Sequence, residues 1–254
     1  MKLKNKVAAI TGAGRGIGRA AADLFAREGA GIALFEIDEK SGLEVEREIR
    51  ERGGEAHLLQ VDVADPESVR NAFCRVNHLF GGLHVIYNNA SIFLGKQDAP
   101  VTELGLDAWN RIIAVNLSGL FHCCKYGLPL MIKSGGGSVI TTASSAGVIG
   151  IPGCDAYTAS KGATVSLTRS MAVEYGPRNI RVNCIAPAAI YTPMLYESNL
   201  NNPAYDEAAF FKKTPLGRYG TPEEIAKVAL FLACDESSYL NGAVIVADGG
   251  ITIT

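Results

Sequence analysis

The chain has 254 residues, of which 48% are hydrophobic and 20% charged, and its 24 basic and 26 acidic side chains give a net charge of −2. This composition excludes an intrinsically disordered chain, and without a basic run it excludes a nucleic-acid-binding module as well. The length fits one large domain or two small ones. Because no linker, repeat or low-complexity tract divides the sequence, we expect a single domain over residues 1–254.

Short apolar runs alternate along the chain with longer segments of helical periodicity. The apolar runs predict strands over residues 7–11, 31–37, 57–63, 84–88, 138–142, 181–185 and 243–246. The segments between them predict helices over residues 17–28, 39–52, 66–80, 106–133, 156–175 and 222–233. Nearly continuous apolar strands suit a parallel sheet that is buried on both faces. The predicted fold is therefore α/β, a single Rossmann-type doubly wound parallel sheet of about seven strands with helices on both faces.

The amino terminus and the cysteine pattern bear on the cellular compartment. Only four apolar residues, Val7 to Ile10, follow the basic start, whereas a secretory signal needs about 7–15. The longest apolar run, Val228 to Cys234, has seven residues, far fewer than the roughly 18 of a membrane span. The six cysteines and four histidines show no metal-ligand spacing. We therefore expect a cytoplasmic protein with reduced thiols, no metal and no membrane partner.

A glycine-rich segment over residues 11–18 separates the first predicted strand from the first predicted helix. Gly12 permits a tight turn, Gly16 lets the backbone approach a phosphate, and Gly18 allows the helix to pack near the strand. A pyrophosphate would then rest on the positive amino-terminal end of the helix. A glycine triplet alone is a weak signal that also fits a flexible turn, but its placement between strand and helix favours nucleotide binding.

Glu36 stands at the end of the second predicted strand, eighteen residues after Gly18. A carboxylate at this position accepts hydrogen bonds from the adenosine ribose hydroxyls and repels a 2′-phosphate. Arg15, in the glycine-rich turn, could instead pair with a 2′-phosphate. We expect the carboxylate to dominate, because bringing two like charges together is costly. The predicted cofactor is NAD, with NADP as the less favoured alternative.

Tyr157 and Lys161 are four residues apart and so share one face of a predicted helix. A phenol with a pKa near 10 is a poor base at neutral pH, but a nearby ammonium favours its phenolate. Ser144 ends the strand before this helix, at the sheet edge where open α/β sheets place their ligands. A Y-x-x-x-K pair alone is usually surface decoration. Here the phenol, the ammonium and the hydroxyl converge on the crevice that also holds the nucleotide turn.

Four motifs together resemble the short-chain dehydrogenase/reductase family over essentially the whole chain. They are T-G-x-x-x-G-I-G at residues 11–18, N-N-A at 88–90, Ser144 thirteen residues before Y-x-x-x-K, and D-G-G at 248–250. The resemblance implies an NAD(H)-dependent oxidoreductase that interconverts a secondary alcohol and its ketone. It also implies a homotetramer, for which the apolar residues around the predicted helices 106–133 and 156–175 give an independent hint.

The resemblance assigns roles to particular residues. It implies Tyr157 as the general acid/base, Lys161 as the group that lowers its pKa and holds the nicotinamide ribose, and Ser144 as the donor to the substrate oxygen. Asn116 resembles the asparagine that holds a proton-relay water. The implied cofactor-binding residues are Gly12, Arg15, Gly16, Ile17, Gly18, Glu36, Asp62, Val63, Asn89, Ala90, Tyr157, Lys161, Pro187, Ile190 and Thr192.

The expected substrate is a small, neutral secondary alcohol or ketone. Its predicted lining is Ser144, Tyr157, Phe93, Ile149, Cys154, Ala188, Met194 and Leu195, with a substrate loop over residues 192–216 as a lid. None of these side chains can pair with an anionic substrate, although Lys96, Lys212 and Lys213 could swing a cation inward. The Cys154 thiol either faces the pocket or is an inert packed cysteine, and the second reading is favoured.

The sequence departs from the family pattern at two positions, and two alternative functions stand beside the predicted one. Ser91 and Ala188 stand where the family usually has glycine, and both add bulk beside the nicotinamide and the substrate. The first alternative function is an NADPH-dependent 3-oxoacyl-carrier-protein-type reductase. The second is a non-catalytic nucleotide-sensing regulator, which is disfavoured because such a protein would have lost the tyrosine, serine or lysine.

Overall fold

A computed structural model describes residues 1–201 and 205–254. Its strands form one parallel sheet in the order β3-β2-β1-β4-β5-β6-β7. The strands are β1 (Val7–Thr11), β2 (Gly31–Glu36), β3 (Ala56–Gln60), β4 (Val85–Asn88), β5 (Gly137–Thr142), β6 (Ile180–Pro187) and β7 (Val244–Ala247). This is the predicted doubly wound fold. The strand order reverses between β1 and β4, and such sheets bind ligands beyond the carboxyl ends of the strands at that point.

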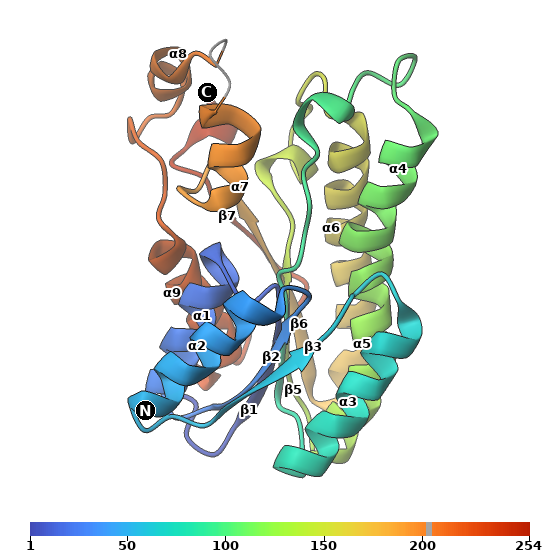
Figure 1. Cartoon of the computed structure of the whole chain (residues 1–254), viewed down its shortest axis with the longest axis vertical. Coiled ribbons are helices and arrows are strands. Elements are labelled where there is room, and N and C mark those ends of the chain that lie inside the picture. The colour runs from blue at the N-terminus through green and yellow to red at the C-terminus, as the bar shows by residue number, and fades with distance from the viewer. Residues whose placement is uncertain (202–204) are drawn as a thin grey trace.

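Helices cover both faces of the sheet (Figure 1). One face carries α1 (Gly16–Arg27), α2 (Glu39–Glu51) and α9 (Pro222–Ala233); the other carries α3 (Pro66–Phe80), α4 (Leu106–Ile113), α5 (Gly119–Lys133) and α6 (Asp155–Tyr175). Alternate side chains of β2 enter different cores: Ile32 and Leu34 pack on the side of α1 and α9, whereas Ala33 and Phe35 pack on the side of α3 and α5. Burial on both faces explains why the strands are apolar without interruption.

Two helices begin and end as predicted because their caps are local. At the start of α3, the Asp65 side chain accepts a hydrogen bond from the Glu67 amide, and at its end Gly81 adopts a left-handed φ of 71°. At the start of α9, Thr221 and Glu224 form a capping box. Such signals lie within a few residues of the helix ends and are therefore readable from the sequence.

The predicted helix over residues 106–133 is wrong as a single α-helix. A π-helical turn, Ala114–Ser118, separates α4 from α5, and the Asn116 side chain within it is bonded to the backbone of Ile92 on another segment. The predicted strand over residues 57–63 is also too long. β3 ends at Gln60, and Asp62 instead accepts a hydrogen bond from the Ala64 amide in the following turn. The other predicted boundaries agree with the structure or differ from it by one or two residues.

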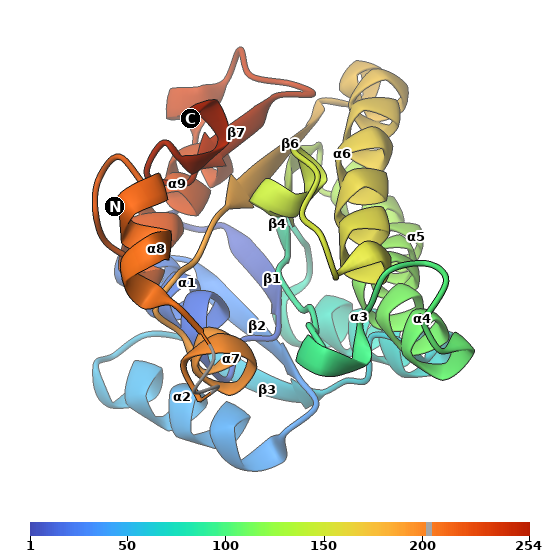
Figure 2. The same ribbon diagram turned by 90° about the horizontal axis from the view of Figure 1, so that it is seen from above.

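The segment that follows β6 lies beyond the carboxyl end of the sheet, at the top of Figure 1 and nearest the viewer in Figure 2. It contains α7 (Pro193–Leu195), a π-helical turn over Tyr196–Leu200 and α8 (Glu207–Lys213). Residues 202–204 of the predicted substrate loop lie outside the described residues. The rings of Phe210 and Phe211 pack on Tyr219, with centroid distances of 5.2 and 4.8 Å, and so attach α8 to the chain leading into α9.

Candidate active site

A cavity of about 1260 Å³ opens beyond the carboxyl ends of the strands. Its walls are the turn after β1, the ends of β2 and β5, the segment after β4, the first turn of α6 and the segment after β6. Every predicted substrate-lining residue borders this cavity, and so does every predicted cofactor-binding residue except Gly18. The sequence motifs, which are spread over 180 residues, therefore meet in one place.

The glycine-rich turn after β1 exposes the amino end of α1 to the cavity. Gly12 and Gly16 have left-handed φ values of 63° and 54°, which side chains larger than hydrogen rarely adopt. Gly18 does not line the cavity; a Cβ there would collide with the Gly12 carbonyl oxygen, so its role is to let helix and turn pack together. No side chain caps α1, and its first turn has no acidic residue. Its free amides suit an anion such as a pyrophosphate.

Glu36 is buried at the end of β2, and backbone amides hold both of its carboxylate oxygens. Oε2 accepts from Gly14 N at 2.8 Å, and Oε1 accepts from Ile37 N at 2.9 Å and Asp38 N at 3.2 Å. A carboxylate has about four acceptor positions, so one remains for a ligand hydroxyl. A Cβ at Gly14 would stand 2.9 Å from Glu36 Oε2, which explains why this position also needs glycine.

Arg15 does not point a free guanidinium at the adenosine end of the cavity. Its Nη1 donates to Glu197 Oε1 at 3.0 Å, and Glu197 belongs to the π-helical turn of the segment above. The sequence had suggested Arg15 as a partner for a 2′-phosphate. Glu197 supplies the counter-charge instead, and no sequence pattern marks this pair, because the two residues are 182 positions apart.

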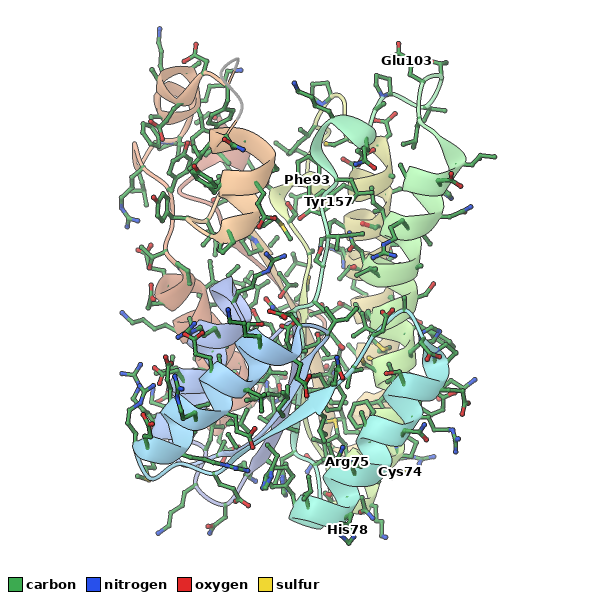
Figure 3. The ribbon with its side chains drawn as sticks, viewed as in Figure 1. Cys74, Arg75, His78, Phe93, Glu103 and Tyr157 are labelled. Carbon is green, nitrogen blue, oxygen red and sulfur yellow. The ribbon has the colours of Figure 1, made fainter. Side chains whose placement is uncertain are left out.

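Tyr157 and Lys161 lie on the first turns of α6 and border the cavity; Lys161 is buried and Tyr157 is half-buried. Lys161 is 2% exposed, and its Nζ donates to Thr142 O at 2.8 Å and lies 5.5 Å from the centre of the Tyr157 ring. The Phe93 ring packs against the Tyr157 ring, and the two ring centroids are 5.0 Å apart. Figure 3 labels both residues. The buried Asp98 fixes the start of the helix by accepting from the amides of Ala156 and Tyr157, at 3.1 and 2.9 Å.

The pKa values of these two residues differ from the expectation. Burial raises the pKa of Tyr157 to about 12, and the hydroxyls of Ser144 and Ser91 lower it only in part. Burial also lowers the pKa of Lys161 to about 8. In the protein alone, desolvation therefore outweighs the predicted effect of the ammonium on the phenol.

Ser144 and Asn116 have different surroundings. Ser144 lines the cavity at the end of β5, and its Oγ accepts from Ala146 N at 3.2 Å, which leaves the hydroxyl proton free to donate. Asn116 does not line the cavity. Its Oδ1 accepts from Ile92 N at 2.8 Å, and its Nδ2 donates to Ile92 O and to Ser160 Oγ. Its side chain thus fixes the segment after β4.

Three comparisons with known proteins agree with this geometry. A family model described as enoyl-(acyl carrier protein) reductase matches residues 12–252. Cyclohexanol dehydrogenase of Acinetobacter sp. strain SE19 is 39% identical over 251 residues, which cover 99% of this chain and 96% of the relative. The chain is a short-chain dehydrogenase/reductase.

Two further members of the short-chain dehydrogenase/reductase family resemble the chain over its whole length. The 3-oxoacyl-[acyl-carrier-protein] reductase FabG of Thermotoga maritima is 39% identical over 253 residues and all of both chains. The crystal structure of levodione reductase superposes with a TM-score of 0.94 at 35% identity, covering 99% of each chain.

Membership of the short-chain dehydrogenase/reductase family implies a nicotinamide cofactor, and the cavity fits one. Left-handed glycines leave room at the free end of α1, and Glu36 retains an acceptor for a ribose hydroxyl. Within residues 1–201 and 205–254, three or more His, Cys, Asp or Glu side chains nowhere gather as a metal site would require. In the same part of the chain, no helix is long and apolar enough to cross a membrane.

Sequence reasoning missed several residues of this dehydrogenase/reductase site. Asp98 holds the start of α6 and Thr142 holds Lys161, but no motif marks either residue because each acts through a contact distant in sequence. Arg111, which no motif marks either, also borders the cavity. Of the three lysines considered, Lys212 and Lys213 border the cavity, and Lys96 does not.

The six cysteines of this dehydrogenase/reductase are free, and all except Cys74 are buried. The Cys154 thiol borders the cavity but donates to Ile151 O at 3.3 Å, and burial raises its pKa. A thiol with a raised pKa is a poor nucleophile. These contacts favour the packed, unreactive alternative for Cys154.

Proposed function

We propose that the protein is an NAD(H)-dependent dehydrogenase that interconverts a small, neutral secondary alcohol and its ketone. The observation that carries the proposal is that Tyr157, Ser144 and the buried Lys161 border the same cavity. A phenol, an ammonium and a hydroxyl that border one cavity are suited to moving a proton on and off an alcohol oxygen.

In oxidation, the Tyr157 phenolate accepts the proton of the substrate hydroxyl while the carbinol carbon loses a hydride. The nicotinamide, when bound, supplies the acceptor for that hydride. The Ser144 hydroxyl donates to the substrate oxygen and fixes its distance from Tyr157. Lys161, held by Thr142 O, stabilises negative charge on the phenolate. In reduction, the Tyr157 phenol returns the proton to the developing alkoxide.

Two features support NAD over NADP. The Glu36 carboxylate borders the cavity at the end of β2, and its negative charge would repel a 2′-phosphate bound beside it. The guanidinium of Arg15 is paired with Glu197 and therefore offers less attraction to a phosphate. Both effects disfavour the binding of NADP relative to NAD.

The substrate assignment follows from the wall around Tyr157. Phe93, Ile149, Ala188, Met194 and Leu195 border the cavity there and are all apolar. A relative whose name specifies cyclohexanol is 39% identical to this chain. We therefore propose a compact, apolar secondary alcohol such as a cyclic one.

The alternative is a 3-oxoacyl-carrier-protein-type reductase. The similarity to the Thermotoga maritima enzyme and the position of Lys212 and Lys213 at the cavity favour it, because a carrier-bound substrate brings anionic groups to the entrance. Steady-state rates on cyclohexanone and on an acetoacetyl thioester of coenzyme A separate the two. A higher kcat/KM for the cyclic ketone supports the proposal, and a tenfold preference for the thioester overturns it.

The proton-transfer role is tested with Tyr157→Phe. General acid/base groups contribute about 10²–10⁴-fold, so we expect turnover to fall by at least that range, measured by the absorbance of the reduced nicotinamide. Binding of NADH, followed by its fluorescence, should survive because the ring still packs against Phe93. Wild-type turnover in Tyr157→Phe would show that another group transfers the proton. An inactive wild type with intact NADH binding would favour the nucleotide-sensing alternative.

A further inference from the structure

The D-G-G motif, residues 248–250, follows β7 and holds the turn that comes after it. That turn is a short 3-10 helix, Ile251–Ile253. Asp248 Oδ1 accepts from Gly250 N at 2.8 Å, and Asp248 Oδ2 accepts from Thr252 N at 2.9 Å and from Thr252 Oγ1 at 2.7 Å. These hydrogen bonds to one carboxylate fix the backbone of residues 248–254, which we call the β7 turn.

The glycines of the β7 turn pack against the end of the substrate loop. A Cβ at Gly249 would stand 2.9 Å from Thr214 Cγ2, and a Cβ at Gly250 would stand 2.9 Å from Pro215 Cγ. Both glycines also have left-handed φ values, 66° and 89°, which other residues rarely adopt. The two segments are bonded across this contact, because Leu216 N donates to Gly249 O at 3.1 Å. The β7 turn and the end of the substrate loop therefore form one wall.

This wall belongs to the substrate half of the cavity. Ile251 and Pro215 both border the cavity. In the sheet, β7 is the edge strand beside β6, and Ser144 follows β5 on the other side of β6, whereas Glu36 ends β2 near the opposite edge. Figure 2 shows β7 and the carboxyl terminus on the side of β6 that is turned away from β2 and α2. Ile251 therefore lies in the half of the cavity that holds Ser144, and not in the half that holds Glu36.

We propose that Ile251 is a specificity-determining residue that limits the size of the substrate ring, and that Asp248 is the positioning residue that holds Ile251 in the cavity wall. Ile251 is half-buried, whereas Ile253 in the same 3-10 turn is 86% exposed and is not part of the wall. A branched side chain in a fixed wall excludes a substrate that needs its volume. The inference rests on the proposed function, because it concerns the ketone or alcohol that Tyr157 converts.

The test compares the reduction of two ketones of different ring size, cyclohexanone and cyclooctanone. Ile251→Ala opens space in the wall. A hydrophobic pocket distinguishes a single methylene by about 10–200-fold, so the ratio of kcat/KM for cyclooctanone to that for cyclohexanone should rise about tenfold. Ile251→Val removes less volume and should raise the ratio by a smaller factor. Binding of NADH, followed by its fluorescence, should not change in either variant.

Ile253→Ala is the matched control, because it makes the same chemical change in the same turn outside the cavity wall. It should leave the ratio at the wild-type value. A wild-type ratio in both Ile251→Ala and Ile251→Val would overturn the proposal, and so would an equal rise in Ile253→Ala. A loss of activity that is equal for both ketones would also overturn it, because that result indicates a structural role alone.

Asp248→Ala tests the positioning role. Without the carboxylate, the β7 turn no longer holds Ile251 in place, so the ratio should rise in the same direction as in Ile251→Ala. Combining the two substitutions should add little to the effect of Ile251→Ala, because Asp248 acts through Ile251. Asp248→Asn keeps one carbonyl acceptor and should give a smaller rise. An unchanged ratio in Asp248→Ala, or full additivity in the double variant, would overturn the role of Asp248.

Failure of this inference is distinguishable from failure of the proposed function. If wild-type protein reduces cyclohexanone and Tyr157→Phe does not, the proposed function stands whatever the ratio in Ile251→Ala. If wild-type protein binds NADH but reduces neither ketone, the proposed function fails and the inference falls with it.

Discussion

Lys161 is a charged side chain that the fold buries without a carboxylate partner among the described residues. Its Nζ has the Thr142 carbonyl oxygen as its hydrogen-bond acceptor, and burial lowers its pKa from 10.5 to about 8. A lysine whose pKa is lower in the folded than in the unfolded chain opposes folding wherever it is protonated in the unfolded chain. We therefore expect Lys161→Met, which keeps most of the apolar stem, to stabilise the protein while it abolishes turnover.

The size of the effect follows from the pKa values. A shift from 10.5 to about 8 at about 1.4 kcal/mol per unit costs about 3 kcal/mol at pH 7, where both states are protonated. In the variant, the Thr142 carbonyl oxygen loses its donor, which costs about 1–3 kcal/mol. The expected net gain at pH 7 is about 1 kcal/mol. As the pH rises through 8, folded wild-type protein loses the Lys161 proton before the unfolded chain does, so the penalty decreases by about 1 kcal/mol by pH 9.

The measurement is the free energy of unfolding from urea denaturation at pH 7 and pH 9, at one protein concentration for every variant. The stability difference between Lys161→Met and wild type should decrease between the two pH values. Lys133→Met removes an exposed lysine at the end of α5 and should change stability by no more than about 0.5 kcal/mol. A difference that does not depend on pH would refute the reasoning, because the buried charge would then carry no penalty.

Three further predictions concern the cofactor, the catalytic helix and the assembly. Glu36→Ser should relax the preference of kcat/KM for NAD toward NADP; a wild-type preference for NADP would contradict the role of the carboxylate. Asp98→Ala leaves two amides of α6 without an acceptor and should cost about 1–2 kcal/mol in urea unfolding; unchanged stability would contradict the cap. Leu106, Phe121 and Val173 expose apolar surface on α4, α5 and α6, so we expect a homotetramer by light scattering; a mass of 26.9 kDa would exclude it.

Periodicity and local motifs predicted the fold, because the signals that define it are short in range. In a strand such as β2, alternate apolar side chains enter two different cores, which requires a sheet that is covered on both faces. Because such strands alternate with helices along the chain, the strands are expected to run parallel. The caps of α3 and α9 lie within four residues of the helix ends. The sequence also placed Ser144 and the glycine-rich turn at strand ends, where a parallel sheet gathers ligand-binding residues, and Tyr157 and Lys161 on one face of the helix after Ser144.

Contacts between distant segments were decided by the tertiary structure alone. The pairing of Arg15 with Glu197, the capping of α6 by Asp98 and the fixing of Ile92 by Asn116 join residues far apart in sequence. The π-helical turn in the predicted helix 106–133 coincides with the last of these. No residue pattern specifies such contacts, because they depend on which loops the finished sheet brings together.

The pKa values of Tyr157 and Lys161 could likewise not be predicted from the sequence. Spacing placed an ammonium near a phenol and predicted a lowered phenol pKa, but it carried no information on solvent. Burial raises the pKa of Tyr157 to about 12 and lowers that of Lys161 to about 8. Desolvation depends on every atom packed around a group and not on its neighbours along the chain. The sequence by itself thus determined which chemical groups meet at the sheet edge, and the tertiary structure decided their pKa values and their partners.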